Sequence, residues 1–193
     1  MKKALMIVSI LFVAVISTAC INNIAVQELN NKAAEFMQKG DYESAMSRLQ
    51  ASLDLDATMY ETHYNLGVAA INAKKYETAI EALENGIKIK PDFADFYYSL
   101  GVAQIGLADD IIDEADIEEE ASADTEKDKV EIKREIKPED KEKAIELRKS
   151  AIENLNKYIE MIPDSKDAEN IKEMIKQSEE FISGDEKKEE QKA

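Results

Sequence analysis

A period of 34 residues in the middle of the chain constrains its fold more than any other feature. The segment Tyr42–Ala45 (Tyr-Glu-Ser-Ala) recurs as Tyr76–Ala79 (Tyr-Glu-Thr-Ala), and Leu66-Gly67 recurs as Leu100-Gly101. The same separation relates Leu49 to Leu83 and Tyr64 to Tyr98. A fixed period of this length is typical of proteins built from stacked copies of one small unit, each packed against its neighbours.

These residues resemble the tetratricopeptide repeat, in which an aromatic residue, Leu-Gly, Tyr, Ala, a bulky apolar residue, Ala and Pro stand at fixed offsets. Small residues such as Gly67 and Ala79 are expected to let two helices approach closely, and Pro91 ends the unit because it cannot continue a helix. The resemblance implies an all-α fold, a tetratricopeptide-type α-solenoid of about three helix-pair repeats plus a C-terminal capping helix. The match is strongest between Tyr60 and Phe93, at His63, Leu66, Gly67, Tyr76, Ala79, Leu83, Gly86 and Pro91.

The repeats are expected over residues 26–59, 60–93 and 94–163, followed by a capping helix over 164–183 and a disordered, charged tail over 184–193. An acidic insert at about 109–140 interrupts the third repeat, since Asp109 to Glu126 contains ten acidic and no basic residues. We expect a solvated loop here, with Pro138 preceding the next helix near Glu139. Ile111, Ile112, Ala115 and Ile117 keep enough apolar content for the first helix of the repeat to extend into the insert. A calcium site and a docking arm for a basic partner are the alternatives; calcium is disfavoured because no Gly provides a sharp ligand-wrapping turn.

The N-terminal residues have the pattern of a targeting segment. Two lysines precede an uncharged run from Ala4 to Ala19 that would span roughly 24 Å as a helix, too short for a bilayer, which predicts a signal peptide over residues 1–19. The run ends at Ser17-Thr18-Ala19-Cys20, which resembles the lipobox of bacterial lipoproteins, although Leu is commoner than Ser at the third position before Cys. The resemblance implies lipidation of Cys20, the only cysteine in the chain, with residues 20–25 as a short tether.

A lipid anchor would place the protein in the bacterial cell envelope. The outer membrane, facing the periplasm, is favoured because residue 21 is Ile rather than the Asp that marks inner-membrane retention; the extracellular face and the inner membrane remain possible. The alternatives to lipidation are an ordinary signal peptide cleaved near Ala19 and an uncleaved anchor.

In the resembled family the first helices of successive repeats line a concave groove that holds a peptide or a partner helix. The chaperone-binding members hold an acidic C-terminus with Lys, Asn and Arg side chains, but only Asn65 matches that pattern here and Asp95 would repel a carboxylate. That ligand class is therefore not expected. The candidate partner-binding residues, carried over by offset, are Asn30, Ala34, Met37, Tyr64, Asn65, Val68, Ile71, Asn72, Tyr98, Ser99, Val102 and Ile105.

Charge and motifs narrow the function classes. A net charge of -16 argues against nucleic-acid binding, because a polyanion requires a basic surface. One His and one Cys make a structural zinc site improbable, and His63 occupies a packed position in its repeat. No nucleophile, phosphate-loop or metalloprotease motif occurs, so no catalytic residue, cofactor, metal or small-molecule substrate is expected.

The sequence thus predicts a membrane-anchored lipoprotein, not an enzyme, that acts as a protein-protein interaction scaffold through its groove. Two alternatives stay open: an envelope-polymer hydrolase that uses clustered carboxylates, and a passive spacer between membrane and wall. A hydrolase would need one carboxyl held in an apolar cleft, which the sequence does not show.

Overall fold

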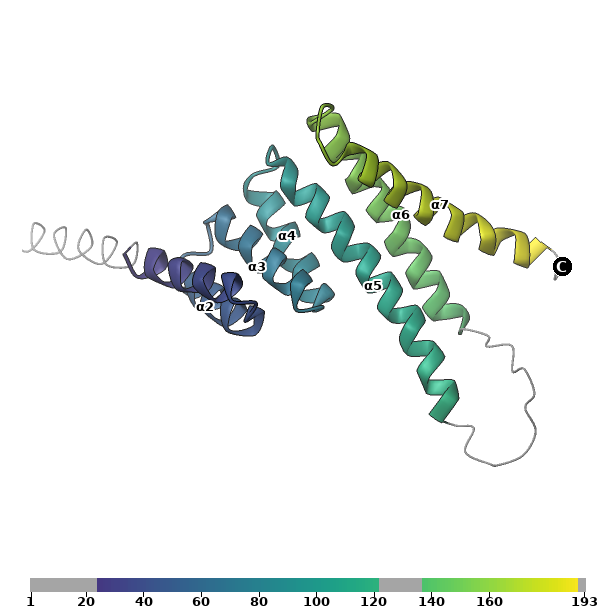
Figure 1. Ribbon diagram of the computed structural model, residues 1–193, viewed down its shortest axis with the longest axis horizontal. Coiled ribbons are helices and arrows are strands. Elements are labelled where there is room, and N and C mark those ends of the chain that lie inside the picture. Colours follow the sequence, from purple (N-terminus) through teal and green to yellow (C-terminus); the bar gives the residue numbers. More distant parts are fainter. Residues whose placement is uncertain (1–23, 122–136, 191–193) are drawn as a thin grey trace, which may run out of the picture.

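The computed structural model describes residues 24–121 and 137–190, and in that part of the chain every regular element is an α-helix (Figure 1). The expected all-α class is confirmed. The expected signal peptide, Cys20 and residues 122–136 of the expected insert lie outside the described residues. Over the described residues, none of the helices combines the length and the apolar composition that crossing a bilayer requires.

The helices form a row of antiparallel pairs. Residues 24–38 are helical and pair with α2 (Tyr42–Leu55), α3 (Tyr60–Asn72) pairs with α4 (Tyr76–Ile89), and α5 (Ala94–Ala121) pairs with α6 (Pro138–Met161). The last helix, α7 (Ala168–Glu190), packs along α6 (Figure 1). Each helix therefore contacts mainly its neighbours in the chain, as stacked repeats require.

Equivalent turns close the first two pairs. Gly40 and Lys74, 34 residues apart, both adopt a positive φ, 74° and 56°, just before the second helix of each pair. Asp41 then caps α2, because its carboxylate accepts a hydrogen bond from the Ser44 backbone N–H at 3.1 Å. Gly tolerates this backbone conformation without strain, whereas Lys74 adopts it at a cost.

The core is divided into three clusters along the row rather than gathered at one centre. The first joins residues 24–38, α2 and α3 around Leu49. The second joins α3, α4 and α5 around Leu83 and Phe96, and the third joins α5, α6 and α7 around Leu155 and Ile171. All five of these side chains are fully buried, with 0% of their surface exposed.

The acidic insert is helical at both of its described ends. The first helix of the third pair continues past Asp109 to Ala121, and α6 begins at Pro138, within one residue of the expected start near Glu139. Ala144 of α6 is fully buried, and Ile111 and Ile112 of α5 are half-buried. Burial at these positions indicates that α5 and α6 pack against each other beyond Asp109, and such packing favours helix there.

The C-terminus differs from the expectation. The tail expected to be disordered from Gly184 onward is helical to Glu190. Gly184 does not adopt the positive φ of a helix-terminating glycine, and a glycine inside a helix lowers its stability by only about 1 kcal/mol without ending it.

Candidate functional site

One face of the first helix in each pair is free of neighbouring helices. On α3 the side chains at Glu61, Asn65, Val68 and Asn72 recur every three or four residues, opposite the buried His63, Leu66 and Ala70. Glu61 and Asn72 are exposed, and Asn65 and Val68 are half-buried. A shift of 34 residues extends this face to the other first helices. We call the whole set the open stripe: Gln27, Asn31, Ala34, Gln38, Glu61, Asn65, Val68, Asn72, Asp95 and Val102.

Only part of the predicted groove lies on this open stripe. Asn65, Val68, Asn72 and Val102 do, as does Ala34. Ser99 shares the register but is buried, with 5% of its surface exposed. The remaining predicted residues stand one position earlier in each helix, where their side chains lie between neighbouring helices: Asn30, Met37, Tyr64, Ile71, Tyr98 and Ile105.

Asn30 illustrates this interior position. Its side-chain amide donates hydrogen bonds to Ser52 Oγ at 3.2 Å and to Thr62 Oγ1 at 3.1 Å. Both hydroxyls are buried, so the amide satisfies polar groups at the junction of three helices. Met37, Ile71 and Ile105 pack against the three core clusters in the same way, one in each repeat.

The two predicted tyrosines also pack inward. The Tyr64 ring meets Phe93 and Phe96 edge-on, at centroid distances of 5.2 and 5.7 Å, and the Tyr98 ring lies 5.5 Å from that of Tyr158. Burial raises the pKa of both tyrosines, opposed at Tyr64 by a hydrogen bond from Ser99. These rings hold successive repeats together, and aromatic pairs of this geometry contribute about 0.5–1.5 kcal/mol beyond their burial.

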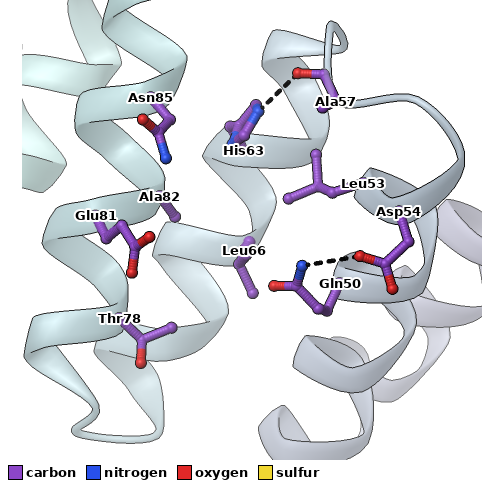
Figure 2. Close-up of a pocket in the computed structure, with 10 residues that line it drawn as sticks. All are labelled: Gln50, Leu53, Asp54, Ala57, His63, Leu66, Thr78, Glu81, Ala82 and Asn85. Carbon is purple, nitrogen blue, oxygen red and sulfur yellow. Dashed lines mark hydrogen bonds between the residues drawn. The ribbon is translucent and has the colours of Figure 1, made fainter.

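A pocket opens on the other side of the second pair, between α2, α3 and α4 (Figure 2). Its volume is about 280 Å³. Leu53, Ala57, Leu66 and Ala82 supply its apolar lining. Its polar lining consists of Gln50, Asp54, His63, Thr78, Glu81 and Asn85.

His63 is the most buried polar side chain of this pocket, with 7% of its surface exposed. Its Nε2 lies 3.0 Å from the carbonyl oxygen of Ala57. Because a carbonyl only accepts, Nε2 carries the hydrogen, and Nδ1 of the neutral ring is then an acceptor. That Nδ1 is buried and has no hydrogen-bond partner. In Figure 2 the ring lies between Ala57 on one side and Asn85 of α4 on the other.

The charges of the pocket are of one sign. Asp54 of α2 and Glu81 of α4 are both exposed carboxylates, and none of the ten lining residues is a lysine or an arginine. Gln50 donates a hydrogen bond to Asp54 at 3.3 Å, which leaves its own amide oxygen as an acceptor. The two carboxylates that line the pocket are therefore both negative, while the ammonium of Lys88, which is not a lining residue, lies 3.0 Å from Asn85 Oδ1.

The sequence reasoning did not find this pocket. His63 was expected to be packed, which the structure confirms, but its neighbours come from three helices and share no spacing. Asn31 and Gln38 of the open stripe were also missed, although a shift of 34 residues from Asn65 and Asn72 identifies them. Within the described residues, no group of three or more His, Cys, Asp and Glu side chains is placed to hold a metal ion.

Comparisons with known proteins identify the repeat and the fold. A family model described as a TPR (tetratricopeptide) repeat matches residues 73–107, which cover α4 and the first half of α5. No curated protein matches this chain.

Several solved structures are similar over most of the chain. The second TPR domain of human RPAP3, in complex with the HSP70 peptide SGPTIEEVD, has a TM-score of 0.58 and 14% identity, covering 80% of this chain and 98% of that one. The Arabidopsis OM64 TPR domain has a TM-score of 0.56 and 12% identity, with 81% and 98% covered. The TPR2B domain of yeast Sti1, in a pHsp70 complex, has a TM-score of 0.51 and 16% identity, covering 81% of this chain and 98% of that one. At these identities the likeness establishes the fold.

Proposed function

We propose that this chain, which contains a tetratricopeptide repeat and folds as a tetratricopeptide-type α-solenoid, is a scaffold that binds an extended segment of another protein along its open stripe. The proposal rests on the side chains that the first helices leave uncovered. It also agrees with the peptide complexes of the similar RPAP3 and Sti1 domains.

The observation that carries this proposal is the chemistry of the open stripe. Four amides, Asn31, Gln38, Asn65 and Asn72, recur at equivalent positions of two successive repeats, next to Ala34 and Val68. An amide side chain both donates and accepts, so it pairs with the N–H and C=O groups of a peptide backbone. At Asn72 the amide donates to the Val68 carbonyl at 2.8 Å, and its oxygen stays available as an acceptor.

The charge of the open stripe selects the kind of segment. Glu61 and Asp95 are acidic, and none of its ten residues is basic. The HSP70 peptide bound by the RPAP3 domain ends in Glu-Glu-Val-Asp, and a segment of that kind would meet like charge here. We therefore propose a neutral or basic segment as the partner of this groove.

We further propose that a lipid on Cys20 anchors this scaffold in the bacterial envelope, with the periplasmic face of the outer membrane favoured. The support is the targeting segment described above. The hydrolase alternative has no specific support, because the carboxylates of the pocket, Asp54 and Glu81, are exposed, whereas a carboxyl acting as general acid at neutral pH is held in an apolar site.

Site-specific photocrosslinking in cells tests the groove. A benzoylphenylalanine at Asn65 or Asn72 is expected to capture one and the same partner, because both positions face the open stripe. The same probe at Glu84, exposed on α4, is the matched control and is expected to capture little of that partner. Equal capture from all three positions, or capture from Glu84 alone, would contradict the proposed groove.

A further inference from the structure

We propose that the pocket between α2, α3 and α4 binds an arginine side chain of a partner protein, at a site separate from the open stripe. The inference goes beyond the groove proposed above. On α3, His63 and Leu66 face the pocket, while Asn65 and Asn72 lie on the opposite side of the same helix. The two sites can therefore be tested independently.

The Nδ1 atom of His63 has no hydrogen-bond partner, and this indicates which kind of group a ligand should supply. Nδ1 is an acceptor in the neutral ring, because Nε2 donates to Ala57, and it is buried without a partner. A buried polar atom without a hydrogen bond is unfavourable, commonly by about 1–3 kcal/mol. Because Nδ1 is closed off from solvent, a ligand reaches it only when the side chains around the pocket move apart, and its donor then removes that cost. The missing group is a hydrogen-bond donor.

The surrounding side chains specify a cationic donor. Asp54 and Glu81 approach the pocket from α2 and α4, and the amide oxygen of Gln50 adds an acceptor from α2. The amide oxygen of Asn85 already accepts a hydrogen bond from Lys88 Nζ at 3.0 Å. Arginine fits this set better than lysine, because its planar guanidinium presents five N–H donors in several directions, whereas the lysine ammonium presents three from one point. The carboxylates also provide the countercharge.

The size of the pocket favours one side chain over a whole small molecule. Pockets for drug-sized ligands usually measure about 300–1,000 Å³, and this pocket has about 280 Å³. Leu53, Leu66 and Ala82 line it with apolar surface, against which the methylene groups of an arginine pack while its charged end meets the acceptors.

Nitrogen NMR of His63 tests the proposal directly. His63 is the only histidine in the chain, so labelling histidine with ¹⁵N gives signals that need no assignment. The full chain, held in neutral detergent micelles at pH 7.5, is titrated with Nα-acetyl-arginine amide. We expect a saturable shift of the Nδ1 resonance, as a donor approaches that atom.

Matched probes and variants test whether the pocket recognises the charge and shape of the arginine side chain. Nα-acetyl-citrulline amide has the shape of the arginine probe without its charge and is expected to bind at least several-fold more weakly, as is Nα-acetyl-lysine amide. Glu81→Gln is expected to weaken arginine binding about fivefold, the effect of losing one exposed ion pair. Glu84→Gln removes a carboxylate from α4 outside the pocket and is expected to leave binding unchanged.

Three results would overturn the proposal. The first is the absence of a saturable Nδ1 shift, and the second is citrulline or lysine binding as tightly as arginine. The third is an equal loss of affinity in Glu81→Gln and Glu84→Gln, which would indicate attraction to the general negative charge of the chain. None of these results bears on the open stripe, whose crosslinking pattern is measured separately.

Discussion

At the scale of single residues, glycines mark the places where helices approach most closely. A Cβ added at Gly86 of α4 would lie 2.2 Å from Cε1 and Cζ of Phe96, a distance that no real contact permits. Phe96 is fully buried and also contacts the rings of Tyr60, Tyr64 and Phe93. The ring therefore has little freedom to move away, and position 86 requires glycine for packing reasons.

We predict that Gly86→Ala lowers the free energy of unfolding by about 1–3 kcal/mol, the usual cost of overpacking a core. Urea unfolding followed by circular dichroism measures it. Gly184→Ala is the matched control, because nothing lies within 4 Å of its added Cβ and alanine favours helix over glycine by up to about 1 kcal/mol. If Gly86→Ala proves as stable as Gly184→Ala, the tight contact with Phe96 is wrong.

The sequence predicted this type of contact but not every pair. Gly67 and Gly101 were expected to allow close helix approach, and their added Cβ atoms would meet Leu83 and Leu155. The sequence analysis assigned both Tyr64 and Asn65 to the groove, because offsets carried over from a family do not separate two adjacent positions. Only the packing of Phe93 and Phe96 against Tyr64 shows which of them is covered.

At the scale of elements, one arginine joins the last three helices. Arg148 of α6 forms an ion pair with Asp109 of α5 and lies over the ring of Phe181 of α7, 4.4 Å from its centroid. The guanidinium is largely buried and its Nε has no hydrogen-bond partner. Asp109 is the first residue of the expected acidic insert, so this contact holds the start of that segment against α6.

Asp109 gives this junction a pH dependence. Burial raises the pKa of Asp109, and the neighbouring Asp113 and Asp110 raise it further, against the lowering effect of Arg148. The folded state therefore holds the proton more tightly than the unfolded state does. The contribution of this carboxyl to stability consequently decreases as the pH rises through its folded-state pKa.

We predict that Asp109→Asn gains stability relative to the wild type as the pH rises from about 4 to 7, because asparagine cannot ionise. Denaturant unfolding at several pH values in this range measures the difference. Glu84→Gln serves as control, since it removes one carboxylate elsewhere and reports the effect of net charge alone. If the free energy of unfolding of the wild type instead rises relative to that of Asp109→Asn as the pH rises, the ion pair with Arg148 affects the pKa of Asp109 more than burial does.

At the scale of the whole molecule, the fold is a row of helix pairs whose three core clusters follow one another along the chain. Such a row presents two long surfaces, one on the first helices and one between the second helices. The open stripe lies on the surface of the first helices, and the pocket between α2, α3 and α4 lies on the surface of the second helices. A scaffold of this shape could therefore contact two segments of a partner at once.

The proposed lipid anchor would attach the helical domain to a membrane. We predict that the wild type expressed in bacteria sediments with membranes and resists extraction by high salt, because several acyl chains hold a protein on a bilayer. Cys20→Ser is expected to lose that attachment, whereas Ser17→Leu, which introduces the commoner lipobox residue, is expected to keep it. Membrane fractionation and mass spectrometry of the N-terminus measure both. A wild type whose N-terminus carries no lipid in the mass spectrum would contradict lipidation.

The sequence by itself determined the all-α class, the repeated helix pair and the pairing of small with bulky residues, because each depends on residue types at fixed short separations. Only the tertiary structure decided three other features: which side chains face the open stripe, whether the acidic segment is helical, and that His63, Asp54 and Glu81 line one pocket. These depend on contacts between helices. A helix such as α5 is prolonged when a partner such as α6 covers its apolar side, and a pocket exists only where three packed helices leave space.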